Sequence, residues 1–213
     1  MVRALLAGTK TQTRRPVKSR TGTFDVCRQA STNQVSDVQA TNADGEHVGT
    51  IACPYGQPGE RLWVRETWGT AVDCIETDSG CFEGDYYTVY RAGGGPAGTP
   101  RNGWKPSIHM RRSDSRILLE IVSVRVERLQ DISHEDAVAE GIEVVDGTLD
   151  DSPVFKNYHP KAFNPVDGFG YPTNSYFSLW DSINGEDSHK ANPWVWVVEF
   201  KRIDAEGKEV ARA

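Results

Sequence analysis

The chain has 213 residues, of which 25% are charged and 38% are hydrophobic. This composition is typical of a globular protein, and the length fits one domain with long insertions better than two domains. The sequence contains no apolar run near the roughly 20 residues that a membrane span needs, and it shows no secretory signal. We therefore expect a cytoplasmic protein that does not act at a membrane.

The charges are unevenly distributed along the chain. The net charge is -6, which disfavours a general coat protein for nucleic acid because phosphate binding needs many cations. Residues 1–20, however, carry six basic side chains and no acidic one. This asymmetry predicts a local anion-binding site on an acidic body. A solvated basic terminus is the alternative.

The first elements are a short helix and an extended segment. Residues 2–7 place two leucines on one helical face, and Gly8 stands where the helix would end. Residues 9–17 are typical of a turn that leads into a strand. The polar stretch 19–50 predicts a surface excursion, with a hairpin around 42–45 as one possibility.

The middle of the chain is rich in β-strand patterns. Residues 61–68 and 85–91 predict strands, and the glycines and prolines of 92–100 predict a loop. The longest strand is expected over 116–127. Its apolar alternation shifts at Val122, which indicates either a bulge or a strand covered on both faces.

The last part contains two expected helices and a closing strand. Ser133 begins a capping pattern for a helix that ends before Gly141. Residues 144–172 are irregular, and a helix capped at Asn174 or Ser175 should end at Gly185. The apolar run 193–200 predicts a central strand.

These elements define the expected fold class. Short strands with scattered helices and no βαβ alternation predict an α+β protein built on a small mixed β-barrel with flanking helices. We treat 1–213 as a single domain with insertions near 19–50, 70–110 and 144–172.

Neither the cysteines nor the histidines form a metal-binding pattern. The four cysteines contain no C-x-x-C pair, and free, partly buried thiols are expected. A single bridge such as Cys74 to Cys81 stays open. No histidines form an H-x-x-x-H pair, so no metal or cofactor is implied.

The basic opening holds the strongest candidate residues. Lys10 brings an amine that can act as a base when it is neutral, and Thr13 brings a hydroxyl that such an amine can activate. Arg14 and Arg15 can bind a phosphate or a base edge. In a straight strand Lys10 and Thr13 would point to opposite faces, so cooperation requires a bend between them. Ordinary surface residues are the alternative.

Two further positions can contribute to a site. Glu66 follows the register of the apolar residues in 61–68, so it either faces a cavity as a functional acid or lies on a solvated edge. Trp68 can stack on a base or belong to the core. Glu140 ends a helix, where the helix dipole does not favour a carboxylate, and a solvated side chain is its alternative.

Several motifs together resemble the ASCH domain, a β-barrel family related to PUA domains. The run from Gly8 through Lys10 and Thr13 to Arg15 is similar to the family's G-x-K-x-x-[ET]-x-R signature. The step 58–62 into a strand and the helix end 139–142 follow in the family's order. The chain as a whole resembles ASCH-like proteins of phages and prophages.

The resemblance implies an activity and its residues. Small bacterial members of the wider family are N4-acetylcytidine amidohydrolases, and their catalytic set matches Lys10, Thr13 and Glu140. The resemblance therefore implies amide hydrolysis, in which lysine accepts the threonine proton, the threonine oxygen attacks the acyl carbon and glutamate orients lysine or the cytosine amino group. The expected substrate-binding residues are Arg14, Arg15, Glu66 and Trp68.

Other functions stay open. The expected partner is a nucleoside or nucleotide, and the acidic body favours such a small substrate over a long polyanion. A binding module for RNA or modified nucleic acid would use Lys10 and Arg15 as phosphate contacts. A ribonuclease is the third possibility. The sequence does not define the oligomeric state.

Overall fold

The structure is a computed structural model of the whole chain. It describes residues 1–18, 25–27, 37–41, 46–77, 80–93, 96, 98–145, 152–159, 168–204 and 206–210. The fold is a mixed α+β arrangement in which strands predominate, as the sequence predicts.

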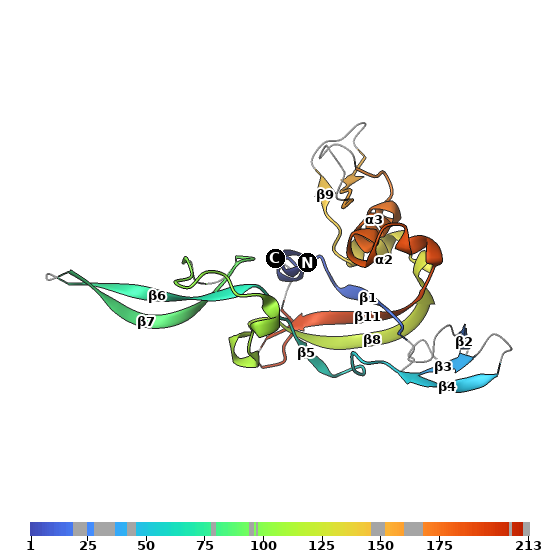
Figure 1. The fold of residues 1–213 in the computed structure, drawn as a ribbon, viewed down its shortest axis with the longest axis horizontal. Coiled ribbons are helices and arrows are strands. Elements are labelled where there is room, and N and C mark those ends of the chain that lie inside the picture. The colour runs from blue at the N-terminus through green and yellow to red at the C-terminus, as the bar shows by residue number, and fades with distance from the viewer. Residues whose placement is uncertain are drawn as a thin grey trace.

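A curved antiparallel sheet forms the centre of the molecule (Figure 1). Its strands lie in the order β1, β11, β8 and β5, and their bounds are Gln12–Pro16, Trp194–Ile203, Leu118–Arg128 and Arg61–Trp63. The prediction that the closing apolar strand is central is therefore confirmed, since β11 pairs with β1 on one side and β8 on the other. Of these four strands, β1 and β5 form the edges.

Three α-helices accompany the sheet in the described part of the chain: α1 at Val2–Leu6, α2 at His134–Ala139 and α3 at Pro172–Asn184. The first two match the sequence predictions, including the Ser133 cap, whose hydroxyl accepts the Asp136 N–H at 3.1 Å. The predicted cap of α3 at Asn174 or Ser175 is wrong. The helix begins at Pro172, because proline has a helical φ and needs no N–H partner in the first turn.

The remaining described helical turns are short 3₁₀ segments, at Ser107–His109, Arg112–Asp114, Leu129–Asp131 and Ser188–Ala191. No helix among the described residues is long and apolar enough to cross a membrane.

Three small antiparallel sheets extend from the centre. One contains β2 to β4, one pairs β6 with β7, and one pairs β9 with β10; their bounds are Asp25–Cys27, Asp37–Thr41, His47–Ala52, Trp68–Thr77, Gly80–Tyr90, Val144–Val145 and Val154–Phe155. The pairing of β3 with β4 confirms the hairpin, whose tip at 42–45 lies outside the described residues. The β6–β7 hairpin projects away from the sheet (Figure 1).

Two details of the middle region differ from the predictions. The single strand expected over 61–68 is interrupted, because β5 ends at Trp63 and β6 begins at Trp68. Between them the Glu66 N–H points to the sulfur of Met110 instead of continuing the ladder. The cysteines differ in part from the expectation of free thiols: Cys53 is a buried thiol, whereas Cys74 forms a disulfide bond.

The core lies on both faces of β11. Val195 and Val197 pack with buried residues of α2 and α3, and Trp196 and Val198 pack on the opposite face with β8. A strand buried on both faces reads as a continuous apolar run, which explains the sequence of 194–198. The sheet therefore offers one face to the helices, and this face positions the candidate site.

A β-bulge in β8 allows one valine to leave the core. The register places Glu199 opposite Ser123 and Phe200 opposite Ile121, so Val122 has no partner of its own. Val122 is 46% exposed, whereas Val124 is 1% exposed. Of the two explanations for the shifted alternation, the structure supports the bulge.

The bulge predicts opposite responses to a lysine at two nearby valines. We expect Val122→Lys to change the free energy of unfolding by less than about 0.5 kcal/mol, because the side chain is exposed. Val124→Lys should cost at least about 3 kcal/mol, since it buries an unpaired charge. Urea unfolding of both variants measures the difference. Equal losses would place Val122 in the core and contradict the register.

Candidate functional site

The candidate site begins where the ends of two helices meet. Gly8 ends α1 with a φ of 72°, and the N–H groups of Thr9 and Lys10 both donate to the carbonyl of Ala4. Lys10 then pairs with Glu140, the residue that ends α2, in an isolated antiparallel bridge. The local turns after both helices therefore bring residues 130 positions apart into contact.

Lys10 and Glu140 form a buried ion pair. The Lys10 Nζ donates to the Glu140 Oε2 at 2.8 Å and to the Glu140 carbonyl oxygen at 2.6 Å. The two residues are only 7% and 5% exposed. Of the sequence alternatives for Glu140, the solvated surface side chain is therefore wrong.

Gly141 leaves room for this contact. Its φ of 78° lies in the left-handed region, which strains any residue with a side chain. A Cβ at this position would lie 2.8 Å from the Cβ of Lys10 and 3.0 Å from the Cβ of Ala4. Both the turn and the close packing of the lysine stem therefore require glycine.

Arg14 lies inside the protein, beside the ion pair. Its Nη2 contacts Asp136 Oδ2 at 2.7 Å and Glu127 Oε2 at 3.1 Å, and its Nη1 lies 3.6 Å from Glu140 Oε1. The Arg14 side chain has no exposed surface. Two of these carboxylates also contact Arg125, so the arginines and acids form a network between α2 and the sheet. The sequence predicted a substrate contact for Arg14 but not this network.

A small cavity joins the predicted catalytic residues. Its lining includes Lys10, Thr13 and Glu140. The rest of the lining comes from the two neighbouring arginines and from one face of α3: Arg14, Arg15, Tyr176, Leu179, Trp180 and Ile183. Lys10 lies before the start of β1, and burial alternates from Lys10 through Arg15. The bend that cooperation between Lys10 and Thr13 requires therefore stays a prediction. The cavity has a volume of about 50 Å³, several times the roughly 10–15 Å³ that one water occupies.

Several polar atoms of the residues that line this cavity form no hydrogen bond within the described chain. They are Arg14 Nε and Nη1, Glu140 Oε1 and Trp180 Nε1, and each is buried. Nη1 and Oε1 lie 3.6 Å apart, so they attract each other by charge but are too far apart for a hydrogen bond. A buried polar group without a hydrogen bond costs about 1–3 kcal/mol.

The charges of the site affect two nearby titrating groups. Burial would raise the pKa of Asp136, but the hydrogen bond from Arg14 and the charges of Arg14 and Arg125 lower it below its usual value. Burial, reinforced by the charge of Glu140, raises the pKa of Tyr176 well above its usual value. Tyr176 therefore stays a neutral phenol at the cavity. The sequence indicated Tyr176 only as a core residue of a helix.

The structure does not bring Glu66 and Trp68 to this cavity. Glu66 is buried in a two-pronged ion pair with Arg116, with both contacts at 2.9 Å. Trp68 is buried, and the Lys105 Nζ lies 4.7 Å from its ring centroid. Neither residue lines a described cavity that includes Lys10. The solvated alternative for Glu66 is therefore wrong, because the residue is only 2% exposed. Its role as a functional acid stays a prediction.

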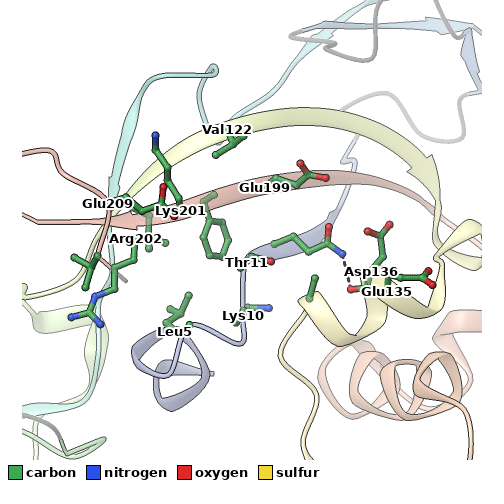
Figure 2. Close-up of a pocket in the computed structure, with 16 residues that line it drawn as sticks. Leu5, Lys10, Thr11, Val122, Glu135, Asp136, Glu199, Lys201, Arg202 and Glu209 are labelled. Atoms are coloured by element: carbon green, nitrogen blue, oxygen red, sulfur yellow. Dashed lines mark hydrogen bonds between the residues drawn. The ribbon is translucent and has the colours of Figure 1, made fainter. Parts of the chain in front are cut away.

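A second, larger cavity of about 370 Å³ also includes Lys10 (Figure 2). Its apolar lining comes from residues such as Leu5 and Phe200. Asp136 and Glu199 point into the same region in Figure 2, and both contact Arg125. Thr13 lines the smaller of these two cavities and not the larger one.

One group of side chains has the spacing of a cation site. The ligand atoms of Asp181, Asp187 and His189 lie within 4.8 Å of one another. Asp181 already accepts from the backbone N–H of His189 at 2.9 Å and contacts its ring at 2.6 Å, and Asp187 pairs with Lys190. These contacts account for the grouping without an ion, because they attach α3 to the turn that follows it.

Comparison with known proteins does not assign the chain. No family model matches it, and no curated protein or solved structure is similar to it. The function has to be inferred from the geometry of the site.

The depressed pKa of Asp136 predicts a pH-dependent contribution to stability. The contribution is fully present above the unfolded pKa of about 3.9 and is lost as the pH falls through the lower folded pKa. We therefore expect the stability gap between the native chain and Asp136→Asn to be constant near neutral pH and to shrink below about pH 4. Denaturant unfolding across this range measures it.

Asp131→Asn is the matched control, because Asp131 is exposed and forms no ion pair with a described residue. Its unfolding profile should follow that of the native chain. A gap for Asp136→Asn that widens in acid would reverse the sign and contradict the assignment.

Gly141→Ala should destabilise the protein by about 1–3 kcal/mol, because alanine is strained at positive φ and its Cβ would collide with Lys10. Gly170→Ala is the control, since nothing lies within 4 Å of a Cβ there. Thermal or urea unfolding compares the two. Equal free energies of unfolding for the two variants would contradict the close packing of Gly141 against Lys10.

Proposed function

We propose that this chain is an amidohydrolase that removes a small acyl group from the exocyclic amine of a cytosine nucleoside or nucleotide, of the N4-acetylcytidine type. One observation carries the proposal. A buried lysine–glutamate pair and a threonine line one cavity, and buried polar atoms of its lining residues form no hydrogen bond within the described chain.

We also propose that the fold is an ASCH-like barrel of the PUA type with insertions. In support, the G-x-K-x-x-T run leads into β1 and the 58–62 step leads into β5. The 139–142 segment ends α2, and β11 lies at the centre of the curved sheet. The order of these landmarks along the chain is that of the family motifs.

The first step of the mechanism is the formation of a base. In the resting state Lys10 donates two hydrogen bonds to Glu140, which is the arrangement of an ammonium beside a carboxylate. Glu140 Oε2, at 2.8 Å, is placed to accept a proton from Nζ. The neutral amine then accepts the proton of the Thr13 hydroxyl as its oxygen attacks the acyl carbon.

The buried donors of Arg14 then stabilise the reaction. Nε and Nη1 form no hydrogen bond within the described chain, so they can donate to the oxyanion of the tetrahedral intermediate. The bond from the acyl carbon to the cytosine nitrogen breaks, and that nitrogen takes the proton held by Lys10. Lys10 then takes a proton from water as the water oxygen attacks the acyl-threonine ester. The ester bond breaks, the Thr13 oxygen takes that proton from Lys10, the carboxylic acid leaves, and Glu140 returns its proton to Lys10.

The cavity size restricts the substrate. At about 50 Å³ the cavity is far smaller than the roughly 300–1,000 Å³ of a typical ligand pocket, so only the acyl end of the substrate would enter it. The sugar would lie at the exposed rim, where Ile183 and Asn184 reach the surface. This geometry favours a substrate with a short acyl group.

The test is hydrolysis of N4-acetylcytidine followed by ultraviolet absorbance. Thr13→Val, Lys10→Met and Glu140→Gln should each lower kcat/KM at least about 100-fold, because each removes one member of the nucleophile and its base. Thr11→Val is the matched control, since Thr11 lines only the larger cavity. It should keep nearly full activity.

Two outcomes would replace the proposal. If no acylated cytidine is hydrolysed and RNA binds in a way that Lys10 and Arg15 substitutions abolish, the chain is a binding module. If RNA is cleaved and the same three substitutions stop cleavage, it is a ribonuclease. Circular dichroism of each variant shows whether a loss of activity reflects unfolding.

A further inference from the structure

A cluster of cations surrounds Trp63, at the end of β5. The guanidinium carbon of Arg65 lies 4.7 Å from the centroid of the Trp63 ring, and that of Arg112 lies 5.9 Å from it. Arg65 also reaches the carbonyl of Ile108 through a long contact of 3.4 Å. We call these residues, together with the adjacent Arg111, the Trp63 patch.

The cations of this patch are not neutralised within the described chain. Arg65, Arg111 and Arg112 are exposed, and none forms an ion pair with a described residue. The segment 101–116, which supplies two of them, contains five basic residues and one acidic residue in a protein of net charge -6. Some cations of the central sheet, in contrast, are paired, for example Lys201 with Glu120 and Arg14 with Asp136.

The patch also has an apolar and aromatic part. The Trp63 ring is half-buried and holds two guanidinium groups near it, and Ile108 is 69% exposed. Flat guanidinium and indole groups are the surfaces on which unpaired bases stack, while nearby cations contact the phosphates. A duplex hides its base faces and cannot use this combination.

We propose that the Trp63 patch binds single-stranded nucleic acid. The phosphates contact Arg65, Arg111 and Arg112, and a base stacks against Trp63 or an arginine above it. This inference goes beyond the proposed function, because no residue of the patch lines the smaller cavity, which Lys10, Thr13 and Glu140 share. The binding proposed for the patch does not depend on the hydrolysis proposed for that cavity.

The experiment measures the binding of a fluorescent 15-nucleotide oligouridine to the full chain by anisotropy at several salt concentrations. Arg65→Ala/Arg112→Ala should weaken binding at least about 10-fold at low salt. It should also reduce the slope of log K against log salt by about 1.4, since each phosphate contact on a single strand contributes about 0.7.

Lys190→Ala/Lys208→Ala is the matched control, because it removes the same charge from exposed lysines elsewhere in the described chain. It should leave the affinity nearly unchanged. Trp63→Leu should weaken binding, and Trp63→Phe should keep most of it, since phenylalanine retains a stacking face. Thermal unfolding of each variant excludes loss of fold.

Three results would overturn the proposal. The first is equal affinity of the arginine variant and the lysine control. The second is tighter binding to a duplex of the same length. The third is patch-dependent binding to anionic lipid vesicles or a phosphopeptide without binding to the oligonucleotide.

Discussion

The buried ion pair between Lys10 and Glu140 is the interaction on which the site depends. Removing two charges from water is costly, and a buried pair is kept only when its geometry and additional hydrogen bonds offset that cost. Here the second hydrogen bond goes to the backbone of Glu140, and the turns at Gly8 and Gly141 bring the two residues together. The pair therefore joins α1 and α2 across the edge of the sheet, beside Thr13.

Arg14 connects this pair to the rest of the fold. Its Nη2 is held by Asp136 and Glu127, and Arg125 is bound to the same two acids. Nε forms no hydrogen bond within the described chain, and Nη1 lies 3.6 Å from Glu140 Oε1. Arg14 thus anchors α2 to the sheet and, in the proposed function, also supplies donors for the substrate.

The sequence predicted the elements better than the contacts between them. Two leucines before Gly8 located α1, the capping pattern at Ser133 located α2, an apolar run located β11, and the shifted alternation at Val122 located the bulge. The partner of Glu66 could not be predicted, because Arg116 lies 50 positions away and only the fold brings it close. The place of Trp180 at the cavity could not be predicted either, because burial and cavity lining produce the same pattern on a helix.

The structure changes the interpretation of the charge distribution more than that of any other sequence feature. The basic opening of the sequence predicted an anion-binding site, because six cations stand there without an acid. In the fold, however, Lys10 and Arg14 are neutralised by carboxylates from α2 and β8, so little of their charge can attract a phosphate. Arg65, Arg111 and Arg112 of the Trp63 patch, by contrast, form no ion pair with a described residue. A count along the sequence cannot separate these cases, since neutralisation depends on which acids the fold places within contact. This difference favours the proposed neutral amide for the smaller cavity and the proposed anion binding for the Trp63 patch.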